Sequence, residues 1–516
     1  MQPSQPGPPA GGPVGATRPL DVRRAGVLLH VTSLPTDHGG PGDLGPAAHA
    51  FVDFLARAGC TVWQVLPLVP THPGDGSPYN AVSAMAGNPE LVSLDRLADA
   101  GLLEAGEVAA VRAGEGEPVQ ARVLAARRFL ETGATAEYET WRAEHGWLED
   151  YVRFVALREA AGLTPWPEWD PGVRDREPAA LAAALEPLAD RLEVLRAEQW
   201  FFFRQWAELL DHAHDRGVLL FGDVPIFVSH DSADVWSSRD LFDLDEDGRP
   251  VTVTGVPPDY FSADGQRWNN PHYDWERMAR DGFAWWRRRV AGQRELFDLV
   301  RIDHFRGLQA SWHIPADAPT AVTGEWVTSP GAEVLTALFE VSGEGTLVAE
   351  DLGTITPEVE RLRREFGLPG MKVLQFAFDG DADNIYLPPR HGELNVVYTG
   401  THDNDTSLGW WESVDEGVRA NARAWFADPA EPMPWALVRV AMASTARLAV
   451  VPAQDLLGLG SDSRMNVPGS AEGNWSWQAA PGAFDRALAD RVRALVEAYG
   501  RRVEPTVLPS GASGTP

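Results

Sequence analysis

The sequence predicts an α/β protein built on a (β/α)8 TIM barrel, with inserted, mainly helical subdomains and no C-terminal β-domain. Short apolar runs with the composition of strands alternate with helical segments along most of the 516 residues, which favours parallel strands joined by crossover helices. Three of these runs end in acidic residues, and a parallel barrel builds its active site at the carboxyl ends of its strands. The length fits a single barrel with insertions.

The two ends of the chain differ in composition from its middle. Residues 1–24 are rich in Pro, Gly, Gln and Ala and are expected to form a disordered tail. The barrel is expected over 25–501, with insertions at about 70–195 and 228–274, and a flexible tail over 502–516. The N-terminal segment lacks the apolar centre of a secretory signal, so we expect a cytoplasmic protein.

The first two strands and the helix between them are well marked. Residues 25–30 and 61–68 are apolar runs, and the helix expected over 47–58 stops at Gly59, which suits a left-handed helix cap. Strand, helix and strand at this spacing indicate a parallel crossover. The turn-rich loop 74–80 follows the second strand.

The next part of the chain contains most of the predicted insertion. Residues 88–195 are dominated by Ala, Leu, Glu and Arg, which predicts an inserted helical subdomain. A helix with an apolar stripe is expected over 198–216, and the third strand, over 218–226, carries Asp223 near its end. Glycines, prolines and large aromatic residues share the loop 255–271, which predicts a lid.

The second half continues the alternation. Further helices are expected at 275–290, 357–366 and 484–499. The fourth to eighth strands are expected within the stretches 299–307, 346–353, 371–378, 395–406 and 450–458. Pro452 weakens the last of these as a central strand, although it could lie at a bend of the barrel. No strand-rich segment follows, hence the prediction of no C-terminal β-domain.

The fourth strand carries Arg301 and Asp303 near its end. Side chains two residues apart on a strand share a face, so these two should point the same way. A guanidinium beside a carboxylate lowers the carboxylate pKa and keeps it ionised, which is what a nucleophilic Asp needs. For one such pair in isolation, a structural ion pair at a strand end is the simpler interpretation.

Two further strand ends favour a functional interpretation. The fifth strand ends at Glu350 and the seventh at Asp403, each after a short apolar run. Because buried carboxylates without partners are costly, acids at apolar strand ends indicate a shared polar pocket. Three converging carboxylates suit glycoside chemistry, in which one attacks, one donates and takes a proton, and one supports the cationic transition state.

The composition restricts the possible partners. The formal charge is −30, and such a surface repels nucleic acid and anionic lipid, so no nucleic-acid or membrane partner is expected. The one cysteine, Cys60, excludes a disulfide within the chain and fits a reducing compartment. The 20 tryptophans include candidates for packing against sugar rings, although most could be core residues.

No cofactor or metal is expected. The acidic stretch 240–248 is a candidate calcium loop, but it lacks Gly at the sixth position and Glu at the twelfth position of the calcium-binding pattern. A solvated acidic turn is the better interpretation.

The three acidic motifs resemble a known family. Arg-Ile-Asp-His-Phe-Arg-Gly, Ala-Glu-Asp-Leu-Gly and Thr-Gly-Thr-His-Asp-Asn-Asp-Thr, in this order, resemble the 4-α-glucanotransferase (amylomaltase) family, glycoside hydrolase family 77, of the α-amylase clan. The resemblance extends over about 25–501. It implies an enzyme of the hexosyl-transferring type that moves α-1,4-glucan segments between maltooligosaccharides or other α-1,4-glucans.

The resemblance also implies residue roles. Asp303 is the implied nucleophile, Glu350 the general acid/base and Asp403 the transition-state stabiliser. The implied substrate-binding residues are Arg301, His402, Ser77, Tyr79, Tyr260, Trp268, Asn474 and Asp223. For Tyr79 and Asp223 a structural role is about as plausible from the sequence, and His402 could only orient its neighbours. The family usually has Trp-Gly-Asn-Pro in the lid, where this chain has Asn269 in place of the glycine.

We therefore expect a retaining reaction through a covalent glucosyl-enzyme, with the carboxyl groups of Asp303 and Glu350 about 5–5.5 Å apart. Glu350 must hold a proton in the first step, so a raised pKa is expected for it. The aromatic lid favours transfer to the 4-hydroxyl of a sugar over transfer to water. The alternatives are an α-glucan hydrolase of the same clan and a non-catalytic glucan-binding barrel. The oligomeric state is not predicted.

Overall fold

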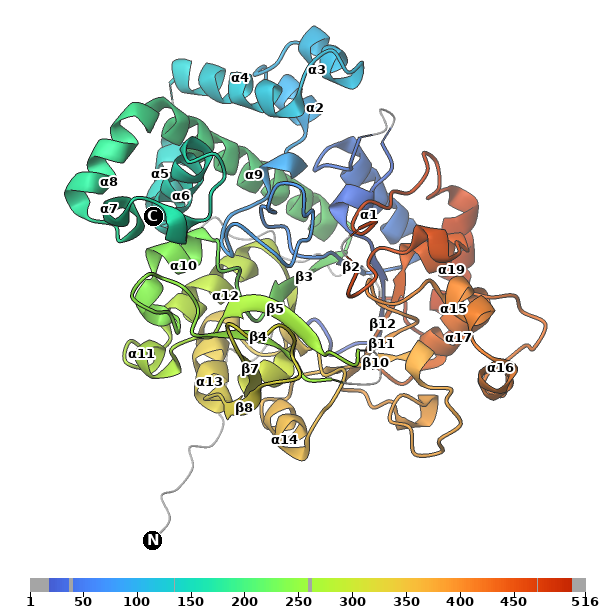
Figure 1. The fold of residues 1–516 in the computed structure, drawn as a ribbon. Helices are drawn as coiled ribbons and strands as arrows, with labels where there is room; N and C mark the ends of the chain where they lie inside the picture. Colours follow the sequence, from blue (N-terminus) through green and yellow to red (C-terminus); the bar gives the residue numbers. More distant parts are fainter. Residues whose placement is uncertain (1–17, 37–39, 134, 259–261, 471, 504–516) are drawn as a thin grey trace.

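A computed structural model of the protein describes residues 18–36, 40–133, 135–258, 262–470 and 472–503. Its centre is an eight-stranded sheet of parallel strands in the order β10-β11-β12-β1-β2-β3-β6-β9 (Figure 1). The strands are β1 (Arg24–Leu28), β2 (Val62–Gln64), β3 (Leu219–Pro225), β6 (Leu299–Asp303), β9 (Leu347–Ala349), β10 (Gly370–Val373), β11 (Asn395–Tyr398) and β12 (Leu448–Pro452).

The sheet curls into a nearly closed barrel, which confirms the predicted fold class. The outermost strands of the order, β9 and β10, come together where the Ala349 N–H donates to the carbonyl of Pro369, at 2.8 Å. The register between β3 and β6 sets Asp223 opposite Arg301 and Pro225 opposite Asp303. Because all strands run in one direction, their carboxyl ends and the acids they carry gather at one end of the barrel.

The barrel strands are short and mainly apolar because both of their faces are covered. Their inward side chains form a buried cluster that includes Val62, Phe221, Val348, Val396 and Val450. The outer faces share one apolar core with the surrounding helices α1 (Pro46–Ala58), α9 (Ala189–Asp215), α12 (Ala284–Leu296), α13 (Gly331–Ser342), α14 (Pro357–Glu365), α17 (Trp435–Ala443) and α19 (Arg486–Ala498). The cap Gly59 takes φ 71°, as predicted for the end of α1.

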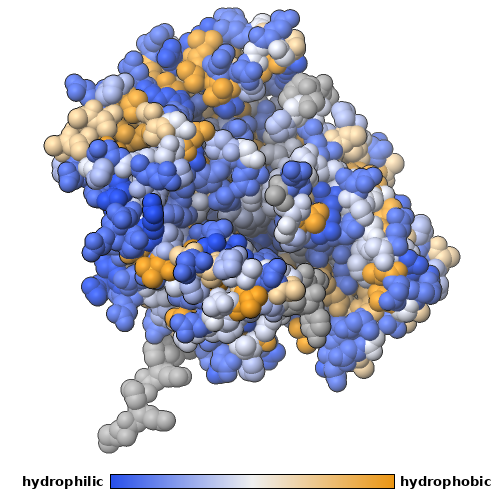
Figure 2. All heavy atoms as spheres, viewed as in Figure 1, coloured by the Kyte–Doolittle hydropathy of each residue, from blue (hydrophilic) through white to orange (hydrophobic). Residues whose placement is uncertain are grey.

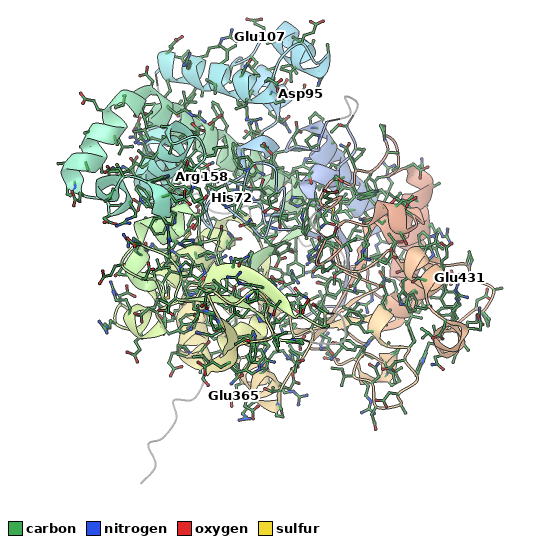
Figure 3. All side chains as sticks on the ribbon, viewed as in Figure 1. His72, Asp95, Glu107, Arg158, Glu365 and Glu431 are labelled. Atoms are coloured by element: carbon green, nitrogen blue, oxygen red, sulfur yellow. The ribbon has the colours of Figure 1, made fainter. Side chains whose placement is uncertain are left out.

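The predicted helical insertion lies between β2 and α9 and projects from one side of the barrel (Figure 1). Its helices are α2 (Leu94–Asp99), α3 (Ala105–Arg112), α4 (Pro118–Glu131), α5 (Ala136–Glu144), α6 (Trp147–Ala160), α7 (Pro171–Arg174) and α8 (Pro178–Leu185). Arg158 ties α6 to the barrel loops. Its Nε donates to Asp231 at 2.8 Å, and its Nη2 lies 3.2 Å from His72 Nδ1 (Figure 3).

The chain also contains a second sheet that the sequence did not lead us to expect. Its four antiparallel strands have the order β5-β4-β7-β8 and lie beside the barrel (Figure 1). They are β4 (Thr252–Val256), β5 (Gln266–Pro271), β7 (Ala310–Pro315) and β8 (Glu325–Thr328). The segment expected as an irregular lid is therefore largely a β-hairpin, and the insertions are not helical throughout. The strand β8 has only four residues and all of them are exposed, so no alternation of buried and exposed side chains revealed it.

Three other elements differ from expectation. The helix predicted over 275–290 is two helices, α11 (Trp275–Ala279) and α12, because Gly282 and Phe283 between them take positive φ. The sixth strand stops at Val373 and continues as a 3-10 turn. The eighth strand ends at Pro452, which caps α18 (Ala453–Leu457). The remaining short helices are α10 (Ala233–Ser237), α15 (Ser407–Ser413) and α16 (Glu416–Arg423).

The two ends of the barrel domain are joined by one buried side chain. Arg501 is fully buried, and its guanidinium donates to the carbonyls of Arg24, Met442, Ser444 and Ala446. The segments predicted as tails fall mostly in 1–17 and 504–516, which lie outside the described residues. Among the described helices, none combines the length and the apolar character needed to cross a bilayer.

Candidate active site

A cavity of about 950 Å³ opens at the carboxyl ends of the barrel strands. This volume lies at the upper end of the usual range for ligand pockets. Asp303, Glu350 and Asp403 all line it, so the structure brings together the three acids that the sequence singled out. The face shown in Figure 2 is mostly hydrophilic and is hollowed near its middle.

Arg301 lines the cavity and binds two carboxylates. Its Nε and Nη2 donate to the two oxygens of Asp223, at 2.9 and 2.6 Å, and the same Nη2 lies 2.9 Å from Asp303 Oδ1. The Tyr79 hydroxyl donates to Asp223 at 2.6 Å and accepts from Arg301 at 3.2 Å. Arg301 and Asp303 thus share a face, as predicted. Burial alone would lower the pKa of Arg301, but Asp223 and Asp303 raise it well above its usual value.

Asp223 supports the site from behind. Asp223 is 2% exposed. Its Oδ1 accepts from Arg301, and its Oδ2 accepts from both Arg301 and Tyr79. It does not line the large cavity. The structure therefore places Asp223 behind Arg301 and Tyr79, and its part in substrate binding stays a prediction.

The electrostatics of Asp303 differ from the expectation that Arg301 would lower its pKa. Removal from water at the base of the cavity raises the pKa of Asp303 to about 6, and Asp223 and Asp403 add to this effect. Arg301 opposes the rise but does not cancel it. Burial outweighs the effect of Arg301, which also pairs with Asp223, a contact that the sequence did not reveal. Asp303 is still mostly ionised at neutral pH.

Glu350 has the raised pKa that a proton donor needs. Burial raises the pKa of Glu350 to about 8, and the nearby charge of Asp303 contributes. Its two carboxyl oxygens accept from the backbone N–H groups of His304 and Leu352, at 2.7 and 2.9 Å. These bonds fix the carboxyl group next to the strand end that carries Asp303. Asp351, by contrast, points away and bonds to the Met371 N–H and Arg363.

The backbone between the two acids has an unusual conformation. His304, directly after Asp303, takes φ 51° and ψ 51°, a left-handed conformation that is uncommon for a residue other than glycine. This turn aims its N–H at Glu350, and Phe305 N–H donates to the Glu350 carbonyl at 3.1 Å. A sparsely populated conformation at an active-site cleft is a common way of holding catalytic groups in place.

Asp403 stays ionised for a different reason. Burial would raise the pKa of Asp403, but His402 and a hydrogen bond from Asn466 hold it well below its usual range. His402 Nε2 lies 3.3 Å from one carboxylate oxygen, and Asn466 Nδ2 donates to the other at 2.6 Å. The three acids therefore have three different tendencies to bind a proton, although they share one cavity.

Aromatic rings form one wall of the cavity. Tyr79 stacks on His402 with ring centroids 5.2 Å apart, and Trp475 lies 5.8 Å from Tyr79. Ser77 also lines the cavity, and its hydroxyl accepts from the Tyr79 N–H at 3.3 Å. The loop 74–80, which carries Ser77 and Tyr79, therefore reaches the site. Flat rings next to polar groups are well suited to packing against the apolar faces of sugars.

The lid hairpin places Trp268 in the cavity. The register between β4 and β5 shifts opposite Val253 and Gly255, so β5 bulges where Trp268 lies. Bulges next to active sites commonly re-aim a side chain. Asn269, where the family usually has glycine, takes φ 67°, a conformation that Asn tolerates better than most residues. Tyr260 lies outside the described residues.

Asn474 lines the cavity as well and holds the loop opposite the lid. Its Oδ1 accepts from the Val467 N–H and its Nδ2 donates to the Ser470 carbonyl, both at 2.9 Å. The same loop contributes Arg464, whose Nη2 donates to the main-chain carbonyl of Asp403 at 2.7 Å. The segment 464–474 therefore positions Asp403 as well as the edge of the cavity.

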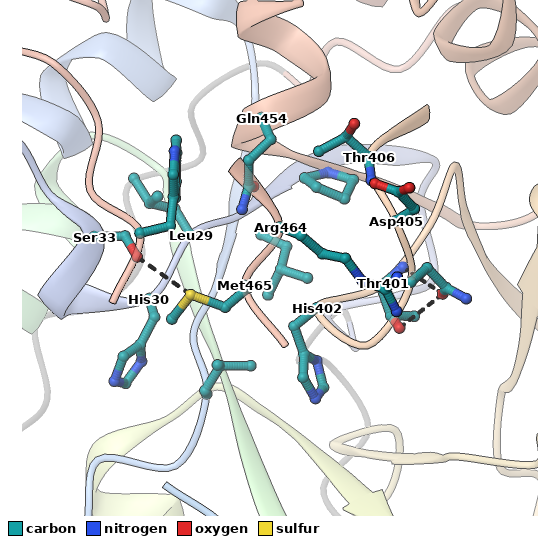
Figure 4. Close-up of a pocket in the computed structure, with 15 residues that line it drawn as sticks. Leu29, His30, Ser33, Thr401, His402, Asp405, Thr406, Gln454, Arg464 and Met465 are labelled. Carbon is teal, nitrogen blue, oxygen red and sulfur yellow. Dashed lines mark hydrogen bonds between the residues drawn. The ribbon is translucent and has the colours of Figure 1, made fainter. Parts of the chain in front are cut away.

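A smaller cavity shares Thr401 and His402 with the large one (Figure 4). It is lined by side chains from β1 and its loop, including His30 and Ser33, and from the 464–477 segment, including Met465. Ser33 Oγ lies 3.7 Å from Met465 Sδ. Thr401 donates twice to Asn404 Oδ1 at 2.9 Å, which closes the turn that carries His402 and Asp403. The residues around this smaller cavity thus hold the turn that carries His402 and Asp403.

Sequence reasoning missed several contributors to the site, above all Asn466 and the backbone N–H groups that bind Glu350. The contact from Asn466 to Asp403 spans 63 residues, and no local sequence pattern predicts it.

Among the described residues, no group of three or more His, Cys, Asp or Glu side chains is arranged to hold a metal ion. The site combines Glu350, whose pKa is raised, with the carboxylates of Asp303 and Asp403, a set of groups that suits proton transfer and nucleophilic attack.

Comparisons with known proteins agree with this geometry. The model of glycoside hydrolase family 77, described as 4-alpha-glucanotransferase, matches residues 29–482. The 4-alpha-glucanotransferase of Thermus thermophilus is 49% identical over 510 residues, covering 93% of this chain and all of the relative. The chloroplastic/amyloplastic 4-alpha-glucanotransferase of Solanum tuberosum is 42% identical over 94% of this chain and 87% of its own length.

Solved structures show the same fold. The amylomaltase of Streptococcus agalactiae, solved in complex with acarbose, superposes with a TM-score of 0.89 at 36% identity, over 93% of this chain and all of that one. The amylomaltase of Corynebacterium glutamicum superposes with a TM-score of 0.76 at 19% identity, over 94% of this chain and 76% of that one. Taken with the three converging acids, these matches establish that the chain belongs to the 4-α-glucanotransferase (amylomaltase) family, glycoside hydrolase family 77.

Proposed function

We propose that the protein is a retaining 4-α-glucanotransferase that disproportionates maltooligosaccharides and related α-1,4-glucans. One observation supports this above all others: Glu350 and Asp303 line one cavity with raised pKa values of about 8 and about 6. Between these values the first carboxyl group holds a proton while the second is ionised. A glycosidase-type displacement needs this combination in its first step.

In the first step, Asp303 attacks the anomeric carbon of the donor and forms an ester bond. The glycosidic C–O bond breaks, and Glu350 gives its proton to the departing 4-oxygen. Asp403, kept ionised by His402 and Asn466, stabilises the positive charge that develops on the sugar ring. Arg301 holds the Asp303 carboxylate in place.

In the second step, Glu350 takes the proton of the acceptor hydroxyl, which attacks the anomeric carbon and breaks the ester. Two inversions leave the anomeric configuration unchanged. A sugar acceptor gives transfer and water gives hydrolysis. The aromatic side chains Trp268, Tyr79 and Trp475 around the site support transfer, because they favour a sugar over water. A separation of about 5–5.5 Å between the carboxyl groups of Asp303 and Glu350 stays a prediction.

Incubation with maltotriose tests the proposal. Two maltotriose molecules are expected to give maltopentaose and glucose, and longer products should follow. Accumulation of glucose and maltose alone, without longer chains, would show hydrolysis and contradict transfer. A 5-fluoroglucosyl fluoride, which slows the second step, should lose its anomeric fluoride and add the mass of one 5-fluoroglucosyl group to the peptide that contains Asp303. Labelling of a different residue would contradict the assigned nucleophile.

Three further proposals concern the extent of the catalytic unit, the binding partners and the location in the cell. We propose that the catalytic unit spans about 25–501, since Arg501 bonds to the first strand. We propose α-1,4-glucans and maltooligosaccharides as partners, which is supported by the family and by the acarbose complex of the Streptococcus agalactiae relative. A cytoplasmic location is consistent with the single, buried Cys60.

A further inference from the structure

The large cavity extends beyond the three acids to the second sheet. There, the edge strand β8 contributes Trp326, which lines the same cavity as Asp303 and Glu350. All four residues of β8 are exposed, and Trp326 is 39% exposed. A large aromatic residue left open to solvent at the wall of a binding cavity requires an explanation, because aromatic side chains gain most from being covered.

Trp326 is held firmly in its position. The guanidinium of Arg306 lies 3.7 Å from the centroid of its ring, and the ring of Trp312, its partner on β7, lies 5.3 Å away. Arg306 itself is 6% exposed, and its Nη1 donates to the carbonyl of Thr354. Its Nε has no hydrogen-bond partner among the described residues. The indole ring therefore rests on a buried cation that follows Asp303 by three residues.

The hydrogen bond from Arg306 to Thr354 relates the position of Trp326 to that of Glu350. Thr354 follows Glu350 by four residues, and Leu352, Gly353 and Thr354 all line the cavity. A general acid must reach the glycosidic oxygen, so the leaving part of the donor lies on the side of Glu350. The acceptor enters on that same side, because the second step is the reverse of the first. Because Arg306 bonds to Thr354 and contacts the ring of Trp326, it connects Trp326 to the loop that follows Glu350.

We propose that Trp326, supported by Arg306, is an acceptor-binding platform that stacks on a glucose unit beyond the one that attacks. This inference rests on the proposed transferase function and extends it to acceptor choice. A single glucose fills only the position next to Glu350, whereas a longer α-1,4-glucan also covers the exposed ring. The enzyme is therefore expected to use maltooligosaccharide acceptors more efficiently than glucose, and Trp326 to cause part of that difference.

The test separates the acceptor step from the donor step. With α-maltotriosyl fluoride as donor, the C–F bond breaks, fluoride leaves, and the ester with Asp303 forms without a leaving sugar on the acceptor side. The kcat/KM values for glucose, maltose, maltotriose and maltotetraose as acceptors are then measured from the transfer products. In Trp326→Ala the ratio of kcat/KM for maltotetraose to that for glucose should fall roughly three- to tenfold, the range expected for one aromatic stacking contact.

Controls distinguish this role from a structural one. Trp425→Ala removes a tryptophan of similar exposure, 38%, that does not line the cavity, and it should leave the ratio unchanged. Trp326→Phe keeps a ring over Arg306 and should restore most of the ratio. If Trp326 only covers Arg306, Trp326→Ala should lower the melting temperature and all kcat/KM values together, with the ratio unchanged, and that result would overturn the proposal.

The same experiment shows whether the underlying function holds. If the unmodified protein releases fluoride but forms no transfer product with any acceptor, the proposed transferase function fails. If it forms transfer products but shows no preference for longer acceptors, or if Trp326→Ala keeps that preference, only the assignment of Trp326 is refuted.

Discussion

Replacement of Asn466 tests how Asp403 acts. Asn466 Nδ2 donates to Asp403 Oδ1 at 2.6 Å, and this bond helps to keep the Asp403 carboxylate ionised. A hydrogen bond to a charged group contributes about 1.5–3 kcal/mol when it is shielded from water. The Asp403 side chain is 45% exposed, so we discount that range to about 1–1.5 kcal/mol. Asn466→Ala should therefore lower kcat roughly five- to twelvefold.

Asn466→Asp should be more damaging, because it places a second negative charge where the donor was. The pKa of Asp403 should then rise, and kcat should fall about a hundredfold or more. The assay is maltotriose disproportionation, with kcat and KM obtained from the release of glucose. KM should change little, since Asp403 acts mainly on the charged transition state.

The matched control is Asn421→Ala, which removes an asparagine of α16 whose Nδ2 donates to the Phe378 carbonyl and which does not line the cavity. It should leave kcat unchanged. The reasoning is refuted if Asn466→Ala stays within twofold of the unmodified protein, or if Asn466→Asp is at least as active as Asn466→Ala.

Three further predictions follow from the site. The kcat/KM for maltotriose should be bell-shaped in pH, falling below about pH 6 as Asp303 gains a proton and above about pH 8 as Glu350 loses one; a flat profile from pH 5 to 9 would contradict the pKa assignments. Asp303→Asn should lower kcat by about 10⁴-fold or more with an unchanged circular dichroism spectrum, whereas residual turnover above a hundredth would exclude the nucleophile role. Asn269→Ala should cost about 1 kcal/mol of unfolding free energy because φ is 67°, while Asn269→Gly should stay within about 0.5 kcal/mol; equal denaturant midpoints for Ala and Gly would refute the strain.

The barrel and its acids were predictable because both depend on short-range patterns. Each barrel strand is a buried, mainly apolar run. Asp303 ends β6, Glu350 directly follows β9, and Asp403 lies in the loop after β11, which stops at Tyr398 and is shorter than predicted. Parallel topology then brings these ends together without further information. The left-handed Asn269 was also foreseeable as a tolerable conformation, because few other residues can replace a glycine there.

Long-range features were not predictable in this way. The pairing of Arg301 with Asp223 joins residues 78 positions apart. The burial of Asp303, which outweighs Arg301 and raises the pKa of Asp303, likewise depends on the folded chain. The second sheet was missed because β8 is short and wholly exposed, so its residues carry no apolar alternation against a core. Its importance lies in Trp326, which only the folded chain brings to the cavity.

The Arg501 anchor makes the chain a good candidate for circular permutation. Arg501 Nη1 donates to the Arg24 carbonyl at 3.0 Å, so a short peptide could link the two segments without crossing the cavity. New ends could open between α3 and α4, where a methyl group added at Gly114 would meet no neighbouring atom. Such a rearranged protein would keep every catalytic strand intact and would move its free ends to the helical insertion, where a fusion partner could be attached.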